Sequence, residues 1–327
     1  MSITHISLCT GYAGLELGLH RALCSLSTLA YCDIELFSCI NLMAKMEQGM
    51  LEAAPIWSNL KTFPWKSFAD RTDILTGGFP CQPFSVSGHR DADNDPKHLW
   101  PFIVKGIKEL NYPNIVFFEN VGGIATATLK ANDWADPEGT SVLLHILREL
   151  ERLGYYADAA LFTASERGAS QERPRYFIMG VHKQASSVFV EKTLQGLTET
   201  LVERGSTDNS QTIPADQVLT QTYKGVDAWP QPPEIPPYAW EPPKAIDART
   251  TSILDLNHEL SGKPTYSINA ADITHCDFDF KEASRLNSSI VDESRLLGNG
   301  IVPAVAEFAF RHLFERIVEN NRALFQE

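Results

Sequence analysis

A cysteine between two prolines is the residue of this chain whose setting most clearly suggests chemistry. Cys81 lies in the stretch GGFPCQPFSVSG, between Pro80 and Pro83. A structural cysteine usually packs inside a helix or strand as a small hydrophobic residue. Proline fixes its own φ and lacks a backbone donor, so this segment reads as a stiff loop after a buried strand. The sequence therefore predicts a thiol directed at a substrate rather than packed in the core.

A glycine-containing turn and an acidic residue predict a site for a nucleoside cofactor. In SLCTGYAGLELGL, Gly11 and Gly14 fall between a strand and a helix, where small residues let the backbone approach a ligand. A glycine turn without a ligand explains this motif alone about equally well. However, the next strand, LAYCDIE, ends at Asp33, where such folds hold a ribose by its hydroxyls. The turn lacks the G-x-G-x-x-G pattern, which disfavours a nicotinamide cofactor.

Alternating strands and helices would position both motifs from residue 3 to about 180. Short apolar runs predict buried strands at 5–10, 29–34, 73–79, 114–120, 157–163 and 175–181. Helical patterns lie between them at 14–23, 102–110 and 141–154. The expected fold is an α/β, Rossmann-like doubly wound sheet. In such a sheet the ligand lies at the carboxyl ends of the strands, where the glycine turn and the cysteine loop both fall.

The pattern changes after residue 181. Seven prolines between Pro230 and Pro243 exclude a regular helix or central strand there. A helix is expected again over 303–325, with Pro303 in its first turn. We therefore expect a catalytic domain over 1–181 and an irregular inserted region over 182–285. A segment over 286–327 would pack back on the catalytic domain.

Composition limits the remaining classes of function. Of the 327 residues, 43% are hydrophobic, which suffices for a large core. The six cysteines form no C-x-x-C pair, which argues against a metal site and against disulfides. We find no signal peptide and no membrane span, so we expect a cytoplasmic protein. The net charge of −13 argues against DNA when taken alone, although a local positive cleft can coexist with an acidic exterior.

Four motifs together make the chain resemble the DNA (cytosine-5) methyltransferases, most closely the compact phage and prophage type. They are Pro80-Cys81-Gln82, Glu119-Asn120-Val121, Gln171-x-Arg173-x-Arg175 and Gly298-Asn299, in the family's order. The resemblance covers about residues 3–181 and 291–315. It implies an S-adenosylmethionine-dependent methyltransferase sheet with an inserted target-recognition region, acting on double-stranded DNA. We expect a monomer without a metal. A cognate restriction endonuclease, if one accompanies it, would act as a separate protein.

The resemblance also implies roles for the catalytic residues. Cys81 would be the thiolate that adds to C6 of cytosine, and Glu119 would donate to the N3 edge of the ring. Arg175 would bind the O2 side of the base, and Arg173 would brace Glu119 and the active-site loop. The loop residues Ser85, Ser87 and Arg90 would close over DNA once the base is flipped out. As alternatives, Glu119 could cap a helix and the arginines could be solvated surface residues.

By the same resemblance, S-adenosylmethionine would lie along the ends of the first strands. The residues implied on its methionine side are Gly11, Tyr12, Ala13 and Gly14. Asp33 and Ile34 would hold the ribose and adenine, and Leu99 and Asn299 would complete the pocket. Cys9 stands where the family commonly has an aromatic residue. Asn59 stands where an aspartate commonly accepts the adenine amino group, so we expect weaker cofactor binding rather than none.

Rival functions remain open at this point. An exocyclic-amine methyltransferase would need no thiol and usually has an Asp/Asn-Pro-Pro-aromatic motif where this chain has Pro-Cys-Gln. A methyltransferase acting on tRNA cytosine would keep the thiol and the glutamate. A catalytically decayed DNA-binding protein is disfavoured by the presence of Cys81, Glu119, Arg173 and Arg175 together.

Overall fold

The structure is a computed structural model that describes residues 2–80, 99–129, 135–167, 172–205, 300–322 and 325. Five of the residues predicted for the site lie outside the described residues: Cys81, Ser85, Ser87, Arg90 and Asn299. The remaining eleven can be placed.

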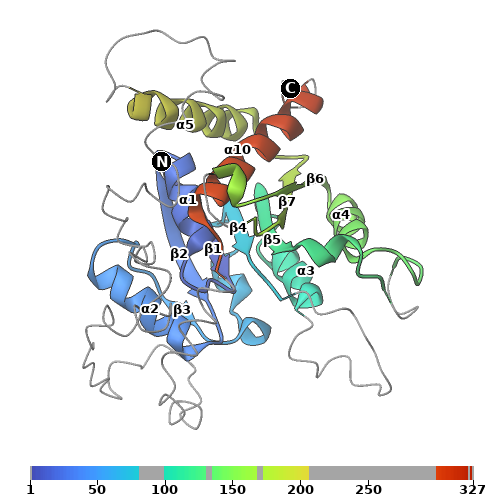
Figure 1. The fold of residues 1–327 in the computed structure, drawn as a ribbon, viewed down its shortest axis with the longest axis horizontal. Helices are drawn as coiled ribbons and strands as arrows, with labels where there is room; N and C mark the ends of the chain where they lie inside the picture. The colour runs from blue at the N-terminus through green and yellow to red at the C-terminus, as the bar shows by residue number, and fades with distance from the viewer. Residues whose placement is uncertain are drawn as a thin grey trace, which may run out of the picture.

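A seven-stranded sheet forms the centre of the molecule, in the order β3-β2-β1-β4-β5-β7-β6 (Figure 1). The strands are β1 (Ile3–Leu8), β2 (Leu26–Cys32), β3 (Ile56–Trp57), β4 (Ile74–Gly77), β5 (Ile115–Val121), β6 (Tyr155–Phe162) and β7 (Arg175–His182). The strands from β3 to β5 pair in parallel, whereas β7 runs antiparallel to both β5 and β6. The strand order reverses between β1 and β4, which is where a doubly wound sheet opens a crevice for a ligand.

Helices cover both faces of the sheet. They are α1 (Gly14–Ala22), α2 (Leu36–Glu47), α3 (Trp100–Glu109), α4 (Val142–Arg152), α5 (Ser187–Gly205) and α10 (Pro303–Asn320). One apolar cluster joins the sheet to α1, α5 and α10, and a second joins it to α3 and α4. The doubly wound α/β fold predicted from the sequence is confirmed.

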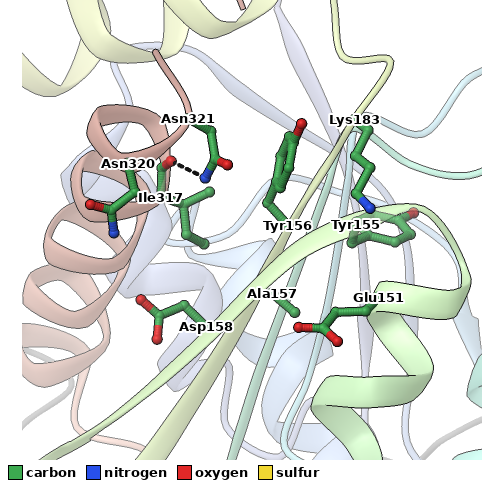
Figure 2. A pocket seen from close by; sticks show the side chains of 9 residues that line it. All are labelled: Glu151, Tyr155, Tyr156, Ala157, Asp158, Lys183, Ile317, Asn320 and Asn321. Carbon is green, nitrogen blue, oxygen red and sulfur yellow. Dashed lines mark hydrogen bonds between the residues drawn. The ribbon is translucent and has the colours of Figure 1, made fainter. Parts of the chain in front are cut away.

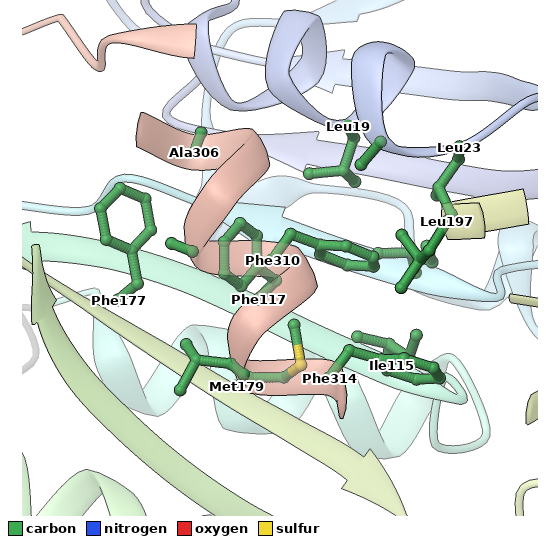
Figure 3. Packing of buried hydrophobic residues seen from close by; sticks show 14 of the residues in the cluster. Leu19, Leu23, Ile115, Phe117, Phe177, Met179, Leu197, Ala306, Phe310 and Phe314 are labelled. Carbon is green, nitrogen blue, oxygen red and sulfur yellow. The ribbon is translucent and has the colours of Figure 1, made fainter. Parts of the chain in front are cut away.

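Helix α10 packs against α1 although the two are far apart in the chain (Figure 1). A Cβ on Gly18 would come within 2.7 Å of Ala306 Cβ and 2.8 Å of the Pro303 carbonyl, so only glycine fits there. Below this contact, Phe310 and Phe314 of α10 stack over the sheet, beside Phe117 of β5 (Figure 3). Helix α10 thus packs on α1 and on the sheet.

Helix α5 differs from the sequence expectation. Residues 187–205 form a helix, whereas the whole segment from 182 was expected to be irregular. Leu197 is buried in the core, and Thr200 Oγ1 donates to the Ala22 carbonyl over 3.1 Å. Arg311 of α10 in turn donates to the Leu197 carbonyl over 2.5 Å. Helix α5 thus packs against α1 and α10. Most of the predicted inserted region, 206–285, lies outside the described residues.

A pocket of about 410 Å³ opens between α4, β6, α10 and the residue that follows β7 (Figure 2). Tyr156 and Lys183 line it, with Lys183 Nζ 5.3 Å from the centre of the Tyr156 ring. Tyr155, which also lines it, pairs with His182 at the end of β7 away from Arg175. The pocket therefore lies at the end of the sheet opposite the predicted site. Among the described helices, none combines the length and apolar character needed to cross a membrane.

Candidate active site

Glu119 lies at the carboxyl end of β5, next to the end of β4 from which the cysteine loop departs. Glu119 is buried, with 6% of the residue exposed. A Cβ added to Gly78 would lie 3.5 Å from Glu119 Oε2, so the carboxylate approaches the chain three residues before Cys81. Asn120 Nδ2 also donates to the Phe79 carbonyl over 3.0 Å. The strand ends that carry the predicted thiol and acid are therefore joined directly.

The ends of the cysteine loop are anchored by aromatic rings. Phe79, on the amino side of residues 81–98, packs 5.7 Å from Trp100 on their carboxyl side. Both rings contact Phe118 of β5 edge to face, at 5.7 and 5.8 Å. The two described ends of the loop are thus fixed to each other and to the strand that carries Glu119.

Glu119 has the electrostatic setting of an acid that works near neutral pH. Arg175 Nε lies 2.9 Å from Glu119 Oε1. Burial raises the pKa of Glu119 to about 7, against the opposing positive charges of Arg175 and Arg173. Because the pKa is close to neutral, a large share of Glu119 carries a proton that it can donate to a substrate. Burial thus keeps a share of this acid protonated although two positive charges beside it favour the ionised form.

The two arginines lie as neighbours, with contacts that refine the roles implied by the resemblance. Arg175 is the arginine whose side chain contacts Glu119, whereas bracing of Glu119 was expected from Arg173. Arg173 instead donates from Nη2 to the Gly300 carbonyl, and it contributes to Glu119 through its charge. Arg173 has φ +42°, a left-handed conformation that costs a non-glycine residue about 1 kcal/mol or more. Such a conformation persists because surrounding contacts hold it.

The turn between β1 and α1 has left-handed backbone angles and is bonded to the end of β2. Gly11 and Ala13 both have left-handed φ angles, +58° and +71°. The Gly11 amide donates to Asp33 Oδ2 over 2.7 Å, and the Glu35 amide donates to Asp33 Oδ1 over 2.8 Å. The turn and the end of β2 are therefore held together by the Asp33 carboxylate.

Gly14 brings the same turn against the segment before α10. A Cβ on Gly14 would lie 2.0 Å from the Ile301 carbonyl oxygen, so a side chain there is excluded. Tyr12 donates its hydroxyl to the same carbonyl oxygen. The sequence pointed to Asn299 in this segment, but gave no signal for contacts made by Gly300 and Ile301.

The groups predicted around the ribose and adenine are arranged along one rim. Asp33 is buried, and burial raises its pKa to about 6 although the Gly11 and Glu35 amides oppose this shift. Ile34 beside it is 66% exposed, an unusual exposure for a large apolar side chain. Both fit a nucleoside, because a carboxylate accepts ribose hydroxyls and an exposed aliphatic side chain packs on a base.

Asn59, Leu99 and Cys9 also belong to this side of the sheet. Asn59 Oδ1 accepts the Lys61 amide over 3.0 Å and so caps the short helix η1 (Leu60–Thr62). Leu99 and Cys9 are half-buried and pack against the core cluster on the α3 side. Burial raises the pKa of the Cys9 thiol, which keeps it protonated. Asn59 thus has a structural contact that the sequence did not indicate.

Among the described residues, no group of three or more His, Cys, Asp or Glu side chains is arranged to hold a metal ion. None of the cysteines in this part of the chain, Cys9, Cys24, Cys32 and Cys39, forms a disulfide.

Known proteins resemble the chain over the same region. The family described as C-5 cytosine-specific DNA methylase matches residues 3–231. The Type II methyltransferase M.NgoMIV of Neisseria gonorrhoeae is 29% identical over 190 residues, covering 58% of this chain and 55% of that protein. M.HpaII of Haemophilus parainfluenzae is 37% identical over 115 residues, covering 35% of this chain and 30% of that protein. The chain thus spans about half or less of the length of these relatives.

A solved structure of S. pombe Dnmt2 methyltransferase shares the fold. It is 14% identical, covers 97% of this chain and 99% of that chain, and superposes with a TM-score of 0.51. The similarity of fold agrees with the family match over residues 3–231, which includes both strand ends of the site. The chain belongs to the C-5 cytosine-specific DNA methylase family.

Proposed function

We propose that this protein transfers a methyl group from S-adenosylmethionine to C5 of a cytosine flipped out of duplex DNA. The observation that carries the proposal is Glu119. It is a buried acid with a pKa of about 7, paired with Arg175 and adjoining the strand end that leads to Cys81. A protonated carboxyl at this position is the group needed to activate a cytosine for attack at C6.

Glu119 supplies the proton side of the reaction. The carbon C5 of cytosine is a poor nucleophile, and addition of the Cys81 thiolate to C6 forms an S–C6 bond and pushes electrons toward N3. Glu119 donates its proton to N3, or hydrogen-bonds it, so that C5 gains enamine character. After methylation, a base removes the C5 proton, the S–C6 bond breaks, and the proton at N3 returns. The methylated base and the free thiolate are then restored.

Arg175 and Arg173 set the charge around this acid. The Arg175 guanidinium orients the Glu119 carboxyl, and it has further donors for a carbonyl such as cytosine O2. Burial and the two positive charges act in opposite directions on the pKa of Glu119 and leave it near neutral. The proposed mechanism uses groups of one chain, in keeping with the expected monomer.

The residues at the ends of β1 and β2 fit a bound S-adenosylmethionine. Asp33 would accept ribose hydroxyls, Ile34 would cover the adenine, and the turn over Gly11–Gly14 would face the methionine. The cofactor supplies an electrophilic methyl group on a sulfonium. The chain's own task is to hold that group close to C5, and the carboxyl ends of β1 and β4 are adjacent in the sheet.

Recognition of the DNA sequence is assigned to the part of the inserted region after α5, about residues 206–285. Base reading by a separate segment would leave the catalytic residues unaffected. A chimera that carries this segment from a related enzyme should methylate that enzyme's site. An active chimera that keeps the original specificity would contradict the assignment.

Two experiments test the proposed function. Bisulfite sequencing of DNA from cells that express the protein should reveal 5-methylcytosine at a defined site. A duplex with 5-fluorocytosine at that site, mixed with protein and S-adenosylmethionine, should then give an adduct that survives boiling in detergent, because fluorine cannot leave as a proton. Cys81→Ala should give neither adduct nor methylated product. Methylation of tRNA in place of duplex DNA would instead establish the rival RNA activity.

A further inference from the structure

The consecutive backbone carbonyls of Gly300 and Ile301 accept hydrogen bonds from side chains in two different parts of the candidate site. Tyr12, in the turn between β1 and α1, donates its hydroxyl to the Ile301 carbonyl over 2.5 Å. Arg173, two residues before β7 begins, donates to the Gly300 carbonyl. The peptide segment Gly300–Ile301 therefore touches both the predicted cofactor turn and the arginine beside the catalytic acid.

The ring of Tyr12 is fixed closely against this segment. A Cβ on Gly300 would lie only 1.5 Å from Tyr12 Cε1, so the ring occupies the space a side chain would need. Lys45 of α2 lies over the ring, with Nζ 5.0 Å from its centre, and donates to the Tyr12 carbonyl. Tyr12 is thus held at its ring, its hydroxyl and its backbone. A shift of the ring requires a shift of Gly300.

The Tyr12 hydroxyl also lies within the electrostatic reach of both catalytic groups. Burial raises the pKa of Tyr12, while the charge of Arg173 lowers it and that of Glu119 raises it. The hydroxyl therefore stays protonated and acts as a donor at any pH at which the enzyme works. Ile301 adds a contact on the other side, because its Cδ1 would be 3.0 Å from a Cβ on Gly78 at the end of β4.

We propose that Tyr12 is a positioning residue that couples the cofactor turn to Arg173 through the Gly300–Ile301 segment. This inference rests on the proposed function, since it assumes a cofactor at the turn and a cytosine bound next to Glu119 and Arg175. A ligand that orders the turn also orders Tyr12, the two carbonyls and hence Arg173 next to Glu119. Coupling between two binding sites is reciprocal, so a duplex engaged at the arginines tightens the turn on the cofactor.

The variant Tyr12→Phe removes the hydroxyl and keeps the ring in its place against Gly300. Calorimetry would measure the affinity for S-adenosylhomocysteine, with and without a duplex that carries the site found by bisulfite sequencing. The wild-type protein should bind the nucleoside more tightly when the duplex is present. The ratio of the affinities with and without duplex should be roughly fivefold smaller in Tyr12→Phe than in the wild-type protein, which is the scale of one hydrogen bond.

A matched control uses a tyrosine at the other end of the sheet. Tyr155 is buried and donates its hydroxyl to the Pro113 carbonyl over 2.8 Å. Tyr155→Phe makes the same chemical change and should leave the duplex-dependent tightening at the wild-type value. A general loss of stability would affect both variants, whereas loss of coupling affects Tyr12→Phe alone.

A second variant approaches the same contact from its partner. Gly300→Ala places a methyl group where the Tyr12 ring lies, and should lose the tightening as well. The double variant Tyr12→Phe/Gly300→Ala should lose less of the duplex-dependent tightening than the sum of the losses in the two single variants, because both substitutions act on one contact.

The outcomes separate the two proposals. A wild-type protein that methylates DNA but binds S-adenosylhomocysteine equally well with and without duplex overturns the coupling. Full tightening in Tyr12→Phe overturns it too. Absence of methyl transfer from the wild-type protein to any DNA would instead overturn the proposed function, and the coupling with it.

Discussion

Two buried carboxylates in contact with arginine have pKa values that are shifted in opposite directions. Glu119 is 6% exposed at the rim of the site, and Asp136 is 3% exposed beside α4. Burial raises the pKa of Glu119 to about 7. The pKa of Asp136 is instead held well below its usual range, chiefly by the hydrogen bonds from Arg152.

The number of donors explains the difference. Asp136 accepts two hydrogen bonds from Arg152, at 2.8 and 3.1 Å, and one each from Arg148 and His145. Among the residues that the structure describes, the ion pair of Glu119 is with Arg175, in a site that removes most of its solvent. Burial with many donors fixes a charge and serves stability, whereas burial with few donors leaves a proton that can move.

Asp136 is connected through His145 and Glu149 to Trp100, next to the cysteine loop. Burial alone would lower the pKa of His145, but its bonds to Glu149 and Asp136 raise it. Glu149 in turn accepts from Trp100 Nε1 over 2.9 Å, and Trp100 is one anchor of the cysteine loop. The structural carboxylate and the loop anchor thus belong to one polar network.

The largest expected effect is on catalysis. Glu119→Gln keeps the shape of the side chain and removes its proton, so kcat for methyl transfer should fall on the order of 10²- to 10⁴-fold. Single-turnover kinetics would measure this. Affinity for S-adenosylhomocysteine serves as the control and should stay close to wild type. A variant with normal kcat would mean that Glu119 is a structural carboxylate like Asp136.

The same variant should change how stability depends on pH. The folded-state pKa of Glu119 is raised, so its contribution is fully present below about pH 4.5 and is lost as pH rises through about 7. The loss is about 3 kcal/mol at most. Urea denaturation of Glu119→Gln between pH 5 and 8 should therefore give a flatter stability curve than that of the wild-type protein.

An effect of intermediate size is expected at Asp136. Asp136→Asn leaves Arg152 and Arg148 without their carboxylate, and should lower the free energy of unfolding by about 2 kcal/mol. We expect less than for a fully buried pair, because these arginines are 44% and 43% exposed. Denaturation at neutral pH measures it. If kcat of the variant falls under conditions in which the protein is still fully folded, Asp136 has a role in the reaction.

The smallest effect is expected on the pH dependence of the reaction when Arg175 is replaced. The charge of Arg175 lowers the pKa of Glu119, so Arg175→Gln should raise that pKa further. The alkaline limb of kcat/KM, assigned to loss of the Glu119 proton, should move up by about one pH unit. The maximal rate should fall as well, because Arg175 is expected to bind the base. An unmoved limb would show that another group sets it.

Much of this arrangement could be predicted from the sequence. Six strands were recognisable as buried apolar runs, and Glu119 could be placed at the end of one of them. Helix α2, LFSCINLMAKME, and the two-residue β3 were not predicted, because the first lacks a clear polar face and the second is too short for a periodicity. Helix α5 was taken as irregular, because its sequence precedes a proline-rich stretch and has only a weak apolar stripe.

The contacts that complete the site could not be predicted. Tyr12 packs against Gly300, and Arg173 donates a hydrogen bond to the carbonyl of Gly300. Both contacts join residues that are remote in the chain. The partners of Arg175 and Arg173 depend on side-chain direction at the end of β7. Motif spacing identifies such residues, whereas only packing in three dimensions identifies what each one touches.

The pairing of α1 with α10 has a consequence for synthesis on the ribosome. Roughly 280 residues separate the two helices, and at about 5–20 residues per second a ribosome needs on the order of 15–60 seconds to span them. Throughout that time Leu19 and the sheet face beneath it lack the phenylalanines of α10. The nascent chain therefore carries an uncovered apolar surface until α10 emerges. Chaperones that shield such surfaces should bind it in this interval.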